Sequence, residues 1–422
     1  MWELIQENKR KSFFLFLAMG ACLLLLGYAA GDLFIGDFEG DSFSDGGFLG
    51  LGFASFVWAG LSLVAYFSGD QILLASSRAK EVSRDVHPQL FNIVEEMKIA
   101  AGLPAMPKIY IIDDPAPNAF ATGRKSERSA VAVTAGLLGR LNRDELQGVI
   151  AHEMSHIMNR DVLFMTFAGV MLGAIVLISD LFWRRSYHRS GSSRRYRSGR
   201  SQGSAQGILL LLALFFVILA PIAARLLYFA LSRRREYLAD ASGARLTRYP
   251  EGLASALEKI ASAGLKPASA NRVTAPMYIA NPFQEEGLGF VHMFSTHPPV
   301  EQRIKILRTM AGGAGYLNYE KAYSAVTGEA HLIPPSGLKE AREVLVREAR
   351  PEEPKELGAK EQARAIGDLT RAVNQFTFLT CVCGLKIKVP PDFKQPKIIC
   401  PRCWHSLEWL GPKSSPALLN TR

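Results

Sequence analysis

Cysteine is scarce in this sequence, and its placement excludes a secreted protein held together by disulfides. The 422 residues include five cysteines. Cys22 stands alone inside an apolar run, whereas the other four lie close together near the C-terminus, at Cys381, Cys383, Cys400 and Cys403. A disulfide framework uses an even set of cysteines spread through a small chain. The lone thiol and the tight cluster therefore need another explanation.

Charged residues are absent from four long stretches, although 21% of the chain is charged. The runs 12–30, 47–67, 162–179 and 207–224 contain no Lys, Arg, Asp or Glu. About 18 to 20 uncharged apolar residues are enough to cross a bilayer as a helix. A freely soluble protein is thus excluded, and the lipid bilayer is a predicted partner. The net charge of +10 then indicates membrane topology and anionic lipid rather than nucleic acid.

Basic residues are absent from the connection 31–46, which is acidic, whereas Lys9, Arg10 and Lys11 precede the first run. Positive charge resists translocation, so we expect a cytoplasmic N-terminus and an external connection. The first run is long for a signal peptide and a second run follows closely. Residues 1–69 are therefore predicted to form an uncleaved transmembrane hairpin.

The third and fourth runs leave two arrangements open. The segment 180–206 between them carries seven arginines, at positions 184, 185, 189, 194, 195, 197 and 200. Full spanning would place these arginines outside, against the usual bias, whereas a re-entrant hairpin would keep them in the cytoplasm. In both cases the hairpin, residues 162–231, returns to the side on which it began.

The segment 70–161 reads as soluble, mixed structure. Apolar spacing predicts a helix over 86–102, and the segments 107–114 and 129–136 have the composition of short strands. Asn142 is a suitable N-cap for a helix that follows it. The fold class expected is α+β, mostly helical.

The pattern His152-Glu153-Met154-Ser155-His156 predicts a metal site. On a helix, residues i and i+4 project from one face, so both imidazoles can reach one ion. Zinc accepts imidazole nitrogen and leaves one position for water in catalytic sites. The intervening glutamate is then placed to take a proton from that water. The alternative is a pair of solvated histidines on an amphipathic helix.

A third ligand is required, and the helical pair Glu236 and Asp240 can supply it. Glu236 would bind the metal, and Asp240 would accept a hydrogen bond from a ligand histidine. The alternative is that this pair merely neutralises the arginines at 233–235. Because Glu236 follows the fourth run and His156 precedes the third, a shared ion requires two membrane crossings or none between them.

Over about residues 1–310 the chain resembles the HtpX-type membrane zinc metallopeptidases, which are relatives of the CAAX prenyl proteases. The matching segments are NAFATG at 118–123, VAVTAGLL at 131–138, RDELQGVIAHEMSHIMNRD at 143–161, SRRREYLAD at 232–240, and STHPP at 295–299 followed by Glu301-Gln302-Arg303. The resemblance implies a gluzincin fold over 70–310, with zinc on His152, His156 and Glu236 and with Glu153 as catalytic base. It also implies a bacterial inner membrane and a cytoplasmic catalytic domain, while a eukaryotic organelle stays open.

Two further groups of residues carry expected roles in catalysis. His297 and Arg303 are the candidates to stabilise the oxyanion of the tetrahedral intermediate, unless they form a helix-start loop with a surface arginine. Asn118, Ala119 and Phe120 resemble the segment that aligns substrate as an added strand in related proteases, which suits extended substrates of varied sequence. The alternative for this segment is an ordinary strand followed by a turn.

The tail is predicted to contain a second metal module. Residues 311–376 read as a helical and charged linker region, with helices expected over 316–328 and 335–350 and a charged linker or helix over 351–365. Residues 377–412 hold the four clustered cysteines, with a strand-like segment KIKV between the pairs. This resembles a zinc ribbon, although its first pair has one intervening residue where the usual ribbon has two. Four thiolates suit one structural zinc, and redox-active thiols are the main alternative.

The leading hypothesis is a membrane-bound zinc endopeptidase that hydrolyses misfolded or membrane proteins at the cytoplasmic face, as in protein quality control. A catalytically inactive homologue acting as a scaffold through its ribbon is the alternative, and the retained Glu153 argues against it. An intramembrane protease would place the histidines within an apolar span, whereas polar residues flank them here. The sequence indicates neither an oligomeric state nor a partner for the ribbon.

Overall fold

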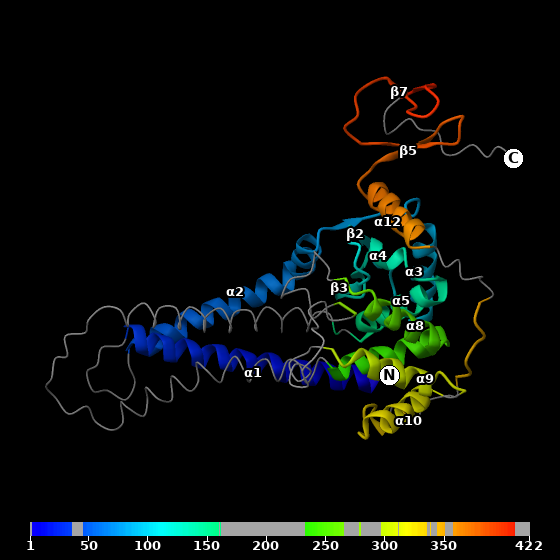
Figure 1. Cartoon of the computed structure of the whole chain (residues 1–422). Helices are drawn as coiled ribbons and strands as arrows, with labels where there is room; N and C mark the ends of the chain where they lie inside the picture. The colour runs from blue at the N-terminus through cyan, green and yellow to red at the C-terminus, as the bar shows by residue number, and fades with distance from the viewer. Residues whose placement is uncertain are drawn as a thin grey trace.

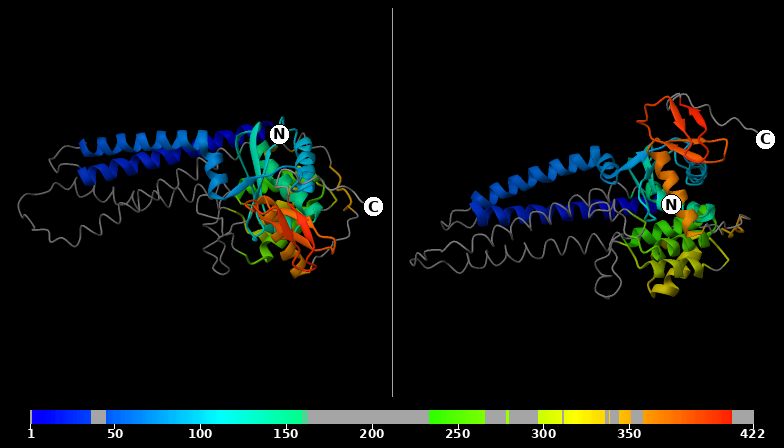
Figure 2. Two further views of the ribbon diagram at one scale, coloured as in Figure 1. Left: turned by 90° about the horizontal axis from the view of Figure 1, so that it is seen from above. Right: turned by 45° about the horizontal axis from the view of Figure 1, so that its top comes forward.

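The computed structural model describes residues 2–35, 45–159, 161, 233–265, 278–279, 297–310, 312–335, 338, 344–350 and 358–409. The third and fourth apolar runs lie outside these residues. A long helical hairpin extends from a compact body, and the N-terminus lies beside that body (Figures 1 and 2). The C-terminal sheets sit on the body, away from the free end of the hairpin (Figure 2).

The hairpin pairs α1 (Trp2–Ile35) with α2 (Asp45–Ser76). Glycine allows the close approach, since a Cβ on Gly31 would lie 2.6 Å from the Cα of Gly50. Small residues of this kind permit tight helix packing in membranes. Large side chains such as Phe53 and Phe56 point outward and are exposed. In the described part of the chain, α2 is long and apolar enough to cross a bilayer, whereas the apolar part of α1, Phe16–Asp32, is shorter.

A four-stranded sheet has the order β1-β2-β4-β3. Its strands are β1 (Ala79–Glu81), β2 (Lys108–Ile112), β3 (Ala119–Lys125) and β4 (Arg128–Thr134). The central pair β2 and β4 is parallel, and the outer pairs are antiparallel. The strands predicted within 107–114 and 129–136 are confirmed. Strand β3 is an edge of this sheet, and it lies against the helix that carries His152 and His156.

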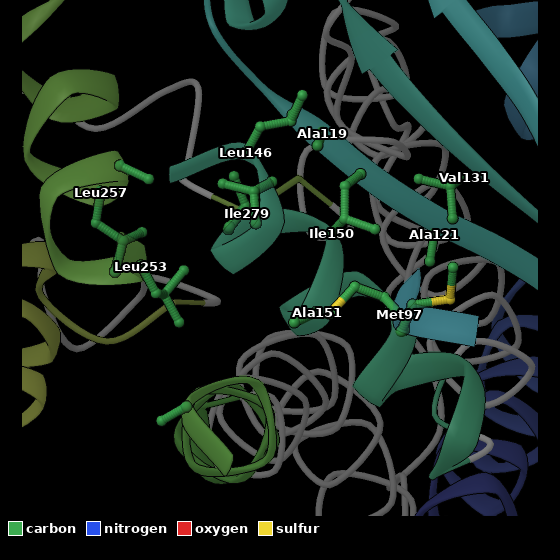
Figure 3. Close-up of a cluster of buried hydrophobic side chains, with 14 of the residues drawn as sticks. Met97, Ala119, Ala121, Val131, Leu146, Ile150, Ala151, Leu253, Leu257 and Ile279 are labelled. Carbon is green, nitrogen blue, oxygen red and sulfur yellow. The ribbon is translucent and has the colours of Figure 1, made fainter. Parts of the chain in front are cut away.

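The helix α5 (Arg143–Met158) runs through the core between the sheet and α8 (Pro250–Ser262) (Figure 3). Its N-terminus is closed by a capping box, in which Asn142 and Glu145 bond each other's backbone N–H, so the predicted cap is confirmed. Helix α3 (Pro88–Ala100) confirms the helix predicted over 86–102. A Cβ on Gly148 would lie 2.7 Å from the backbone nitrogen of Leu253, so glycine lets α5 and α8 cross closely.

Helix α4 (Ala135–Leu138) follows β4, whereas α9 (Val300–Thr309) packs between α8 and α10 (Tyr316–Thr327) on the other side of the body (Figure 1). Helix α10 agrees with the predicted 316–328. The helix predicted over 335–350 is wrong for 344–350, which is not helical. There Val344 accepts a backbone hydrogen bond from Ala314, and Leu345 forms a bridge with Gly313. These long-range partners, together with the side-chain contacts of Arg347, outweigh the local helical pattern.

The tail continues through α12 (Ala359–Val373) into two separate hairpins, β5 (Thr377–Thr380) with β6 (Lys386–Val389) and β7 (Lys397–Ile399) with β8 (Ser406–Glu408). The strand expected at KIKV is confirmed as β6. The hairpins share a small core of Val389, Ile398 and Trp409.

Candidate metal centre

Two helices bring the predicted ligands together inside the body. Helix α5 carries His152 and His156, and residues 233–247, which are helical, carry Glu236. One ligand atom from each of these three residues lies within 4.8 Å of the others. His152 is fully buried and Glu236 nearly so. The shared-ion arrangement expected from the sequence is therefore geometrically possible.

The separations of the ligand atoms fit a tetrahedral ion. The Nε2 atoms of His152 and His156 are 3.3 Å apart, and the Glu236 carboxylate lies 3.6 Å from the first and 3.5 Å from the second. Zinc bonds to nitrogen and oxygen of about 2.1 Å give a tetrahedron with edges of about 3.4 Å. The three side chains thus offer one face of such a tetrahedron.

Each histidine is oriented by a buried carboxylate on its other ring nitrogen. The Nδ1 of His152 lies 2.9 Å from Asp240, and the Nδ1 of His156 lies 3.3 Å from Asp161. Such partners fix the tautomer, so that Nε2 presents a lone pair to a metal. Burial lowers the pKa of His156, but the contacts with Asp161 and Glu236 outweigh it and hold the pKa well above its usual value.

The guanidinium group of Arg303 forms two hydrogen bonds with the carboxylate of Asp240. Its Nε and one terminal nitrogen donate to the two Asp240 oxygens at 2.8 and 2.7 Å, and the other donates to the Ile279 carbonyl at 2.7 Å. Its side chain is fully buried. Arg303 is therefore no surface residue, and its main partner is the carboxylate that holds His152.

Among the described residues, the charges buried around the cluster do not balance. Four carboxylates and two guanidinium groups leave two negative charges when the carboxylates are ionised and the imidazoles neutral; the groups are Glu153, Asp161, Glu236, Asp240, Arg235 and Arg303. Buried charges are normally paired or bound to a metal. Burial raises the pKa of Glu236, yet the neighbouring histidines outweigh it and hold the pKa well below its usual range. An excess of two negative charges matches a divalent cation.

Glu153 stands next to the cluster, and none of the described residues gives its carboxylate a hydrogen bond of ordinary geometry. Its side chain is 1% exposed. Burial dominates its environment and raises its pKa, although the histidines and the backbone of Ala121 act in the opposite direction. A buried carboxylate with so little hydrogen bonding from the described residues points to a further group that completes its surroundings.

The remaining predicted residues fall into two groups. His297 lies at the cluster, with its Nδ1 3.0 Å from Glu236. Asn118 is buried and bonded to Thr134 at the start of β3. Neighbouring Ala119 accepts a hydrogen bond from the backbone of Ile279 at 3.0 Å, and Phe120 packs edge-on against Tyr278. The first residues of β3 are thus occupied by this chain itself.

Sequence reasoning missed Asp161 and Arg235. Asp161 follows His156 by five residues and ends the RDELQGVIAHEMSHIMNRD segment, but its spacing does not reveal which histidine it meets. The Nε of Arg235 lies 3.8 Å from Asp161. This contact joins the end of one ligand-bearing helical segment to the start of the other, so only the tertiary fold could have shown it.

A second group of possible ligands lies in the tail. The four cysteines Cys381, Cys383, Cys400 and Cys403 have sulfur atoms within 4.8 Å of one another. They belong to the two C-terminal hairpins and share no ligand with the His/Glu cluster.

Comparisons with known proteins agree with this geometry. The family model described as peptidase family M48 matches residues 84–311. A protease HtpX homolog from Dictyoglomus turgidum is 46% identical over 309 residues, covering 73% of this chain and 94% of that protein. One from Caldanaerobacter subterraneus is 42% identical over 310 residues, covering 74% and 98%.

A crystal structure of S. mikatae Ste24p covers 73% of this chain and 67% of that chain at 20% identity and a TM-score of 0.40, which is too low to establish a shared fold. The family model, in contrast, spans more than half of the chain, and the two relatives align along nearly their whole length. The chain therefore belongs to peptidase family M48 and is a hydrolase of the metalloprotease type.

Proposed function

We propose that the chain is a membrane-bound, zinc-dependent endopeptidase that hydrolyses unfolded or membrane proteins at the cytoplasmic face. His152, His156 and Glu236 would hold the catalytic zinc. When bound, zinc polarises the scissile carbonyl and lowers the pKa of its water towards neutrality. The match between the ligand separations and a tetrahedron, and the excess of two buried negative charges, support this assignment.

The environment of Glu153 is the main support for this proposal. Its carboxylate is buried beside the ligands and makes no ordinary hydrogen bond among the described residues. It is therefore available to accept a proton from the attacking water and to deliver it later to the leaving amine. A glutamate of purely structural function at this depth would be expected to have a partner.

His297 is the group we assign to the developing oxyanion. It lies at the cluster, 3.0 Å from Glu236, and its imidazole can donate a hydrogen bond. Arg303, the other residue expected there, is bonded to Asp240 and Ile279. We therefore propose that Arg303 positions His152 through Asp240. A terminal nitrogen of Arg303 lies 3.6 Å from the carboxylate of Glu236.

The edge of β3 is the proposed substrate cradle. Backbone groups alternate along a strand, so Ala121 and Gly123 share the outward edge with Ala119. Ala119 already bonds Ile279, and an extended substrate would pair from Ala121 onward, next to Glu153. The segment expected to bind substrate, Asn118 to Phe120, would then support this cradle. Backbone pairing tolerates varied side chains, which favours unfolded substrates.

The hairpin supports the membrane assignment. The N-terminus and the end of α2 both lie at the body, whereas the end of α1 and the start of α2 lie far from it (Figure 1). Lys9, Arg10 and Lys11 would therefore lie on the same side as the body, which the positive-inside rule makes the cytoplasm.

The test is Glu153→Gln in purified full-length protein in detergent. The ligands stay while the base is lost, so we expect zinc content to be unchanged and cleavage of casein-like and membrane substrates to fall by about 10²–10⁴-fold. Glu361→Gln, an exposed glutamate on α12, is the matched control and should cleave like the wild type. A chelator should abolish cleavage by both active chains. Wild-type activity in Glu153→Gln would refute the mechanism.

A further inference from the structure

The four cysteines of the tail sit at the turns of the two C-terminal hairpins. The first turn, residues 381–384, connects β5 to β6 and is closed by a hydrogen bond from the Gly384 amide to the Cys381 carbonyl. The second turn, residues 400–404, connects β7 to β8 and is closed by a bond from the Trp404 amide to the Cys400 carbonyl. Each turn ends in a left-handed residue, with φ of 80° at Gly384 and 60° at Trp404.

The separations between the sulfur atoms are compatible with a tetrahedral metal site. Cys381 and Cys403 have sulfurs 3.4 Å apart, and those of Cys383 and Cys400 are 3.7 Å apart. Four thiolates bound to zinc at about 2.3 Å would have sulfurs about 3.8 Å apart. A disulfide would require about 2.05 Å. In both close pairs the partners come from different turns, so an ion would join the two hairpins.

The shorter spacing of the first pair does not prevent this geometry. Cys381 and Cys383 are separated by Val382 alone, yet the tight turn with left-handed Gly384 brings both sulfurs within 4.8 Å of the second pair. Val382 is 78% exposed, whereas Cys381 is buried and Cys383 is half-buried, so the side chain between the two thiols points outward.

The two hairpins need a link of this kind. They form separate two-stranded sheets with strands of three or four residues, and isolated hairpins are marginal in water. Their shared buried cluster is Val389, Ile398 and Trp409. Units of fewer than about 40 residues usually require a metal, disulfides or a partner for stability.

We propose that the four cysteines bind a second, structural zinc ion that holds the C-terminal hairpins together. Four protein ligands would leave no position for water, so this ion would not take part in hydrolysis. The module is connected to the protease body through α12, whose Asp368 contacts Lys388 of β6 and whose Thr370 bonds Asp113 after β2. The inference is independent of the proposed proteolytic function.

Metal analysis of the full-length protein tests the proposal. We expect about two zinc ions per wild-type chain and about one in the double variant Cys383→Ser/Cys400→Ser. Glu236→Ala should also retain about one, because it affects the other cluster. Cys22→Ser is the matched control and should keep both. With cobalt in place of zinc, Glu236→Ala should keep the strong thiolate-to-metal absorption that the double cysteine variant lacks.

A second measurement does not depend on folding of the cysteine variant. In the Cys22→Ser chain, the four tail cysteines are the remaining thiols. Maleimide should modify them only after a chelator is added, because metal-bound thiolates are protected. Modification without chelator, or modification that needs a reductant instead, would overturn the proposal. The proposal would also be overturned if the wild type bound a single zinc ion and Glu236→Ala lost it. If the wild type bound a single ion that was lost only in the double cysteine variant, the catalytic zinc site would be refuted and the structural zinc site in the tail would be supported.

Discussion

At the scale of single residues, the two histidines proposed as ligands, His152 and His156, each lie beside a different buried carboxylate. Asp240 holds His152 from the helix that also carries Glu236, and is itself fixed by Arg303. Asp161 holds His156 and lies within 3.8 Å of Arg235. Partners of this type fix ring orientation, and their loss typically lowers metal affinity 10- to 100-fold.

Asp161→Ala is therefore expected to weaken zinc binding at the catalytic cluster about 10- to 100-fold, with a smaller loss in Asp161→Asn, whose amide oxygen can still accept the hydrogen bond from His156. Competition with a chelator of known affinity measures this directly. Asp392→Ala, which removes an exposed carboxylate in the tail, is the control. Unchanged zinc affinity in Asp161→Ala would show that His156 is oriented without it.

Local spacing explains which of these residues the sequence could reveal. His152, Glu153 and His156 lie within one and a half turns of a helix, so helical geometry alone brings them to one site. The same holds for Glu236 and Asp240. The partners of Arg303 and Asp161 depend on how separate helices pack, which no spacing rule encodes. The contact of Arg303 with Asp240 could for that reason not be predicted from the sequence.

At the scale of elements, the helical hairpin depends on contact between backbones. A Cβ on Gly50 would lie 2.2 Å from the carbonyl oxygen of Gly27 and 2.7 Å from the Cα of Gly31. Contacts with backbone cannot be relieved by a side-chain rotation. In the same helix, a Cβ on Gly52 would meet no atom within 4 Å, which provides a comparison at nearly the same membrane depth.

Gly50→Ala is expected to destabilise the protein by about 1–3 kcal/mol because it forces α1 and α2 apart. Gly52→Ala should be neutral or slightly stabilising, since alanine is the better helix former. Thermal unfolding of both variants in the same detergent measures the difference. Equal unfolding temperatures would mean that the hairpin is not packed through Gly50.

Element prediction succeeded where the pattern is local and failed where the partner is remote. The Asn142 cap with its capping box, the strand at 108–112 and the helix Tyr316–Thr327 follow from nearby residues. Residues 344–350 have a helical composition but are not helical, and Val344 and Leu345 pair with Ala314 and Gly313 instead. Nothing in their own sequence encodes those contacts.

At the scale of the whole molecule, the chain beyond the family match supports the site. The family model ends at residue 311, yet Arg347 connects the two ligand-bearing helices. Its side chain donates to Asp144 at 2.7 Å in the first turn of α5, and to the Thr247 carbonyl at 3.0 Å at the end of the helix that carries Glu236. It also lies over the ring of Tyr249, with 4.7 Å to the centroid.

Arg347→Ala should therefore weaken the packing between the two helices that carry the proposed ligands, although in the described part of the chain Arg347 does not touch the ligands themselves. Hydrogen bonds to charged groups contribute about 1.5–3 kcal/mol, and partial exposure places the expected destabilisation at the lower end, about 1–2 kcal/mol. We expect a lower temperature of inactivation and a weaker hold on the catalytic zinc, with cleavage near the wild-type rate at low temperature. Arg364→Ala, an exposed arginine on α12, is the control. The opposite result would be that Arg347→Ala keeps both the zinc affinity and the inactivation temperature of the wild type. That result would show that residues up to 311 hold the two helices together without the contacts of Arg347.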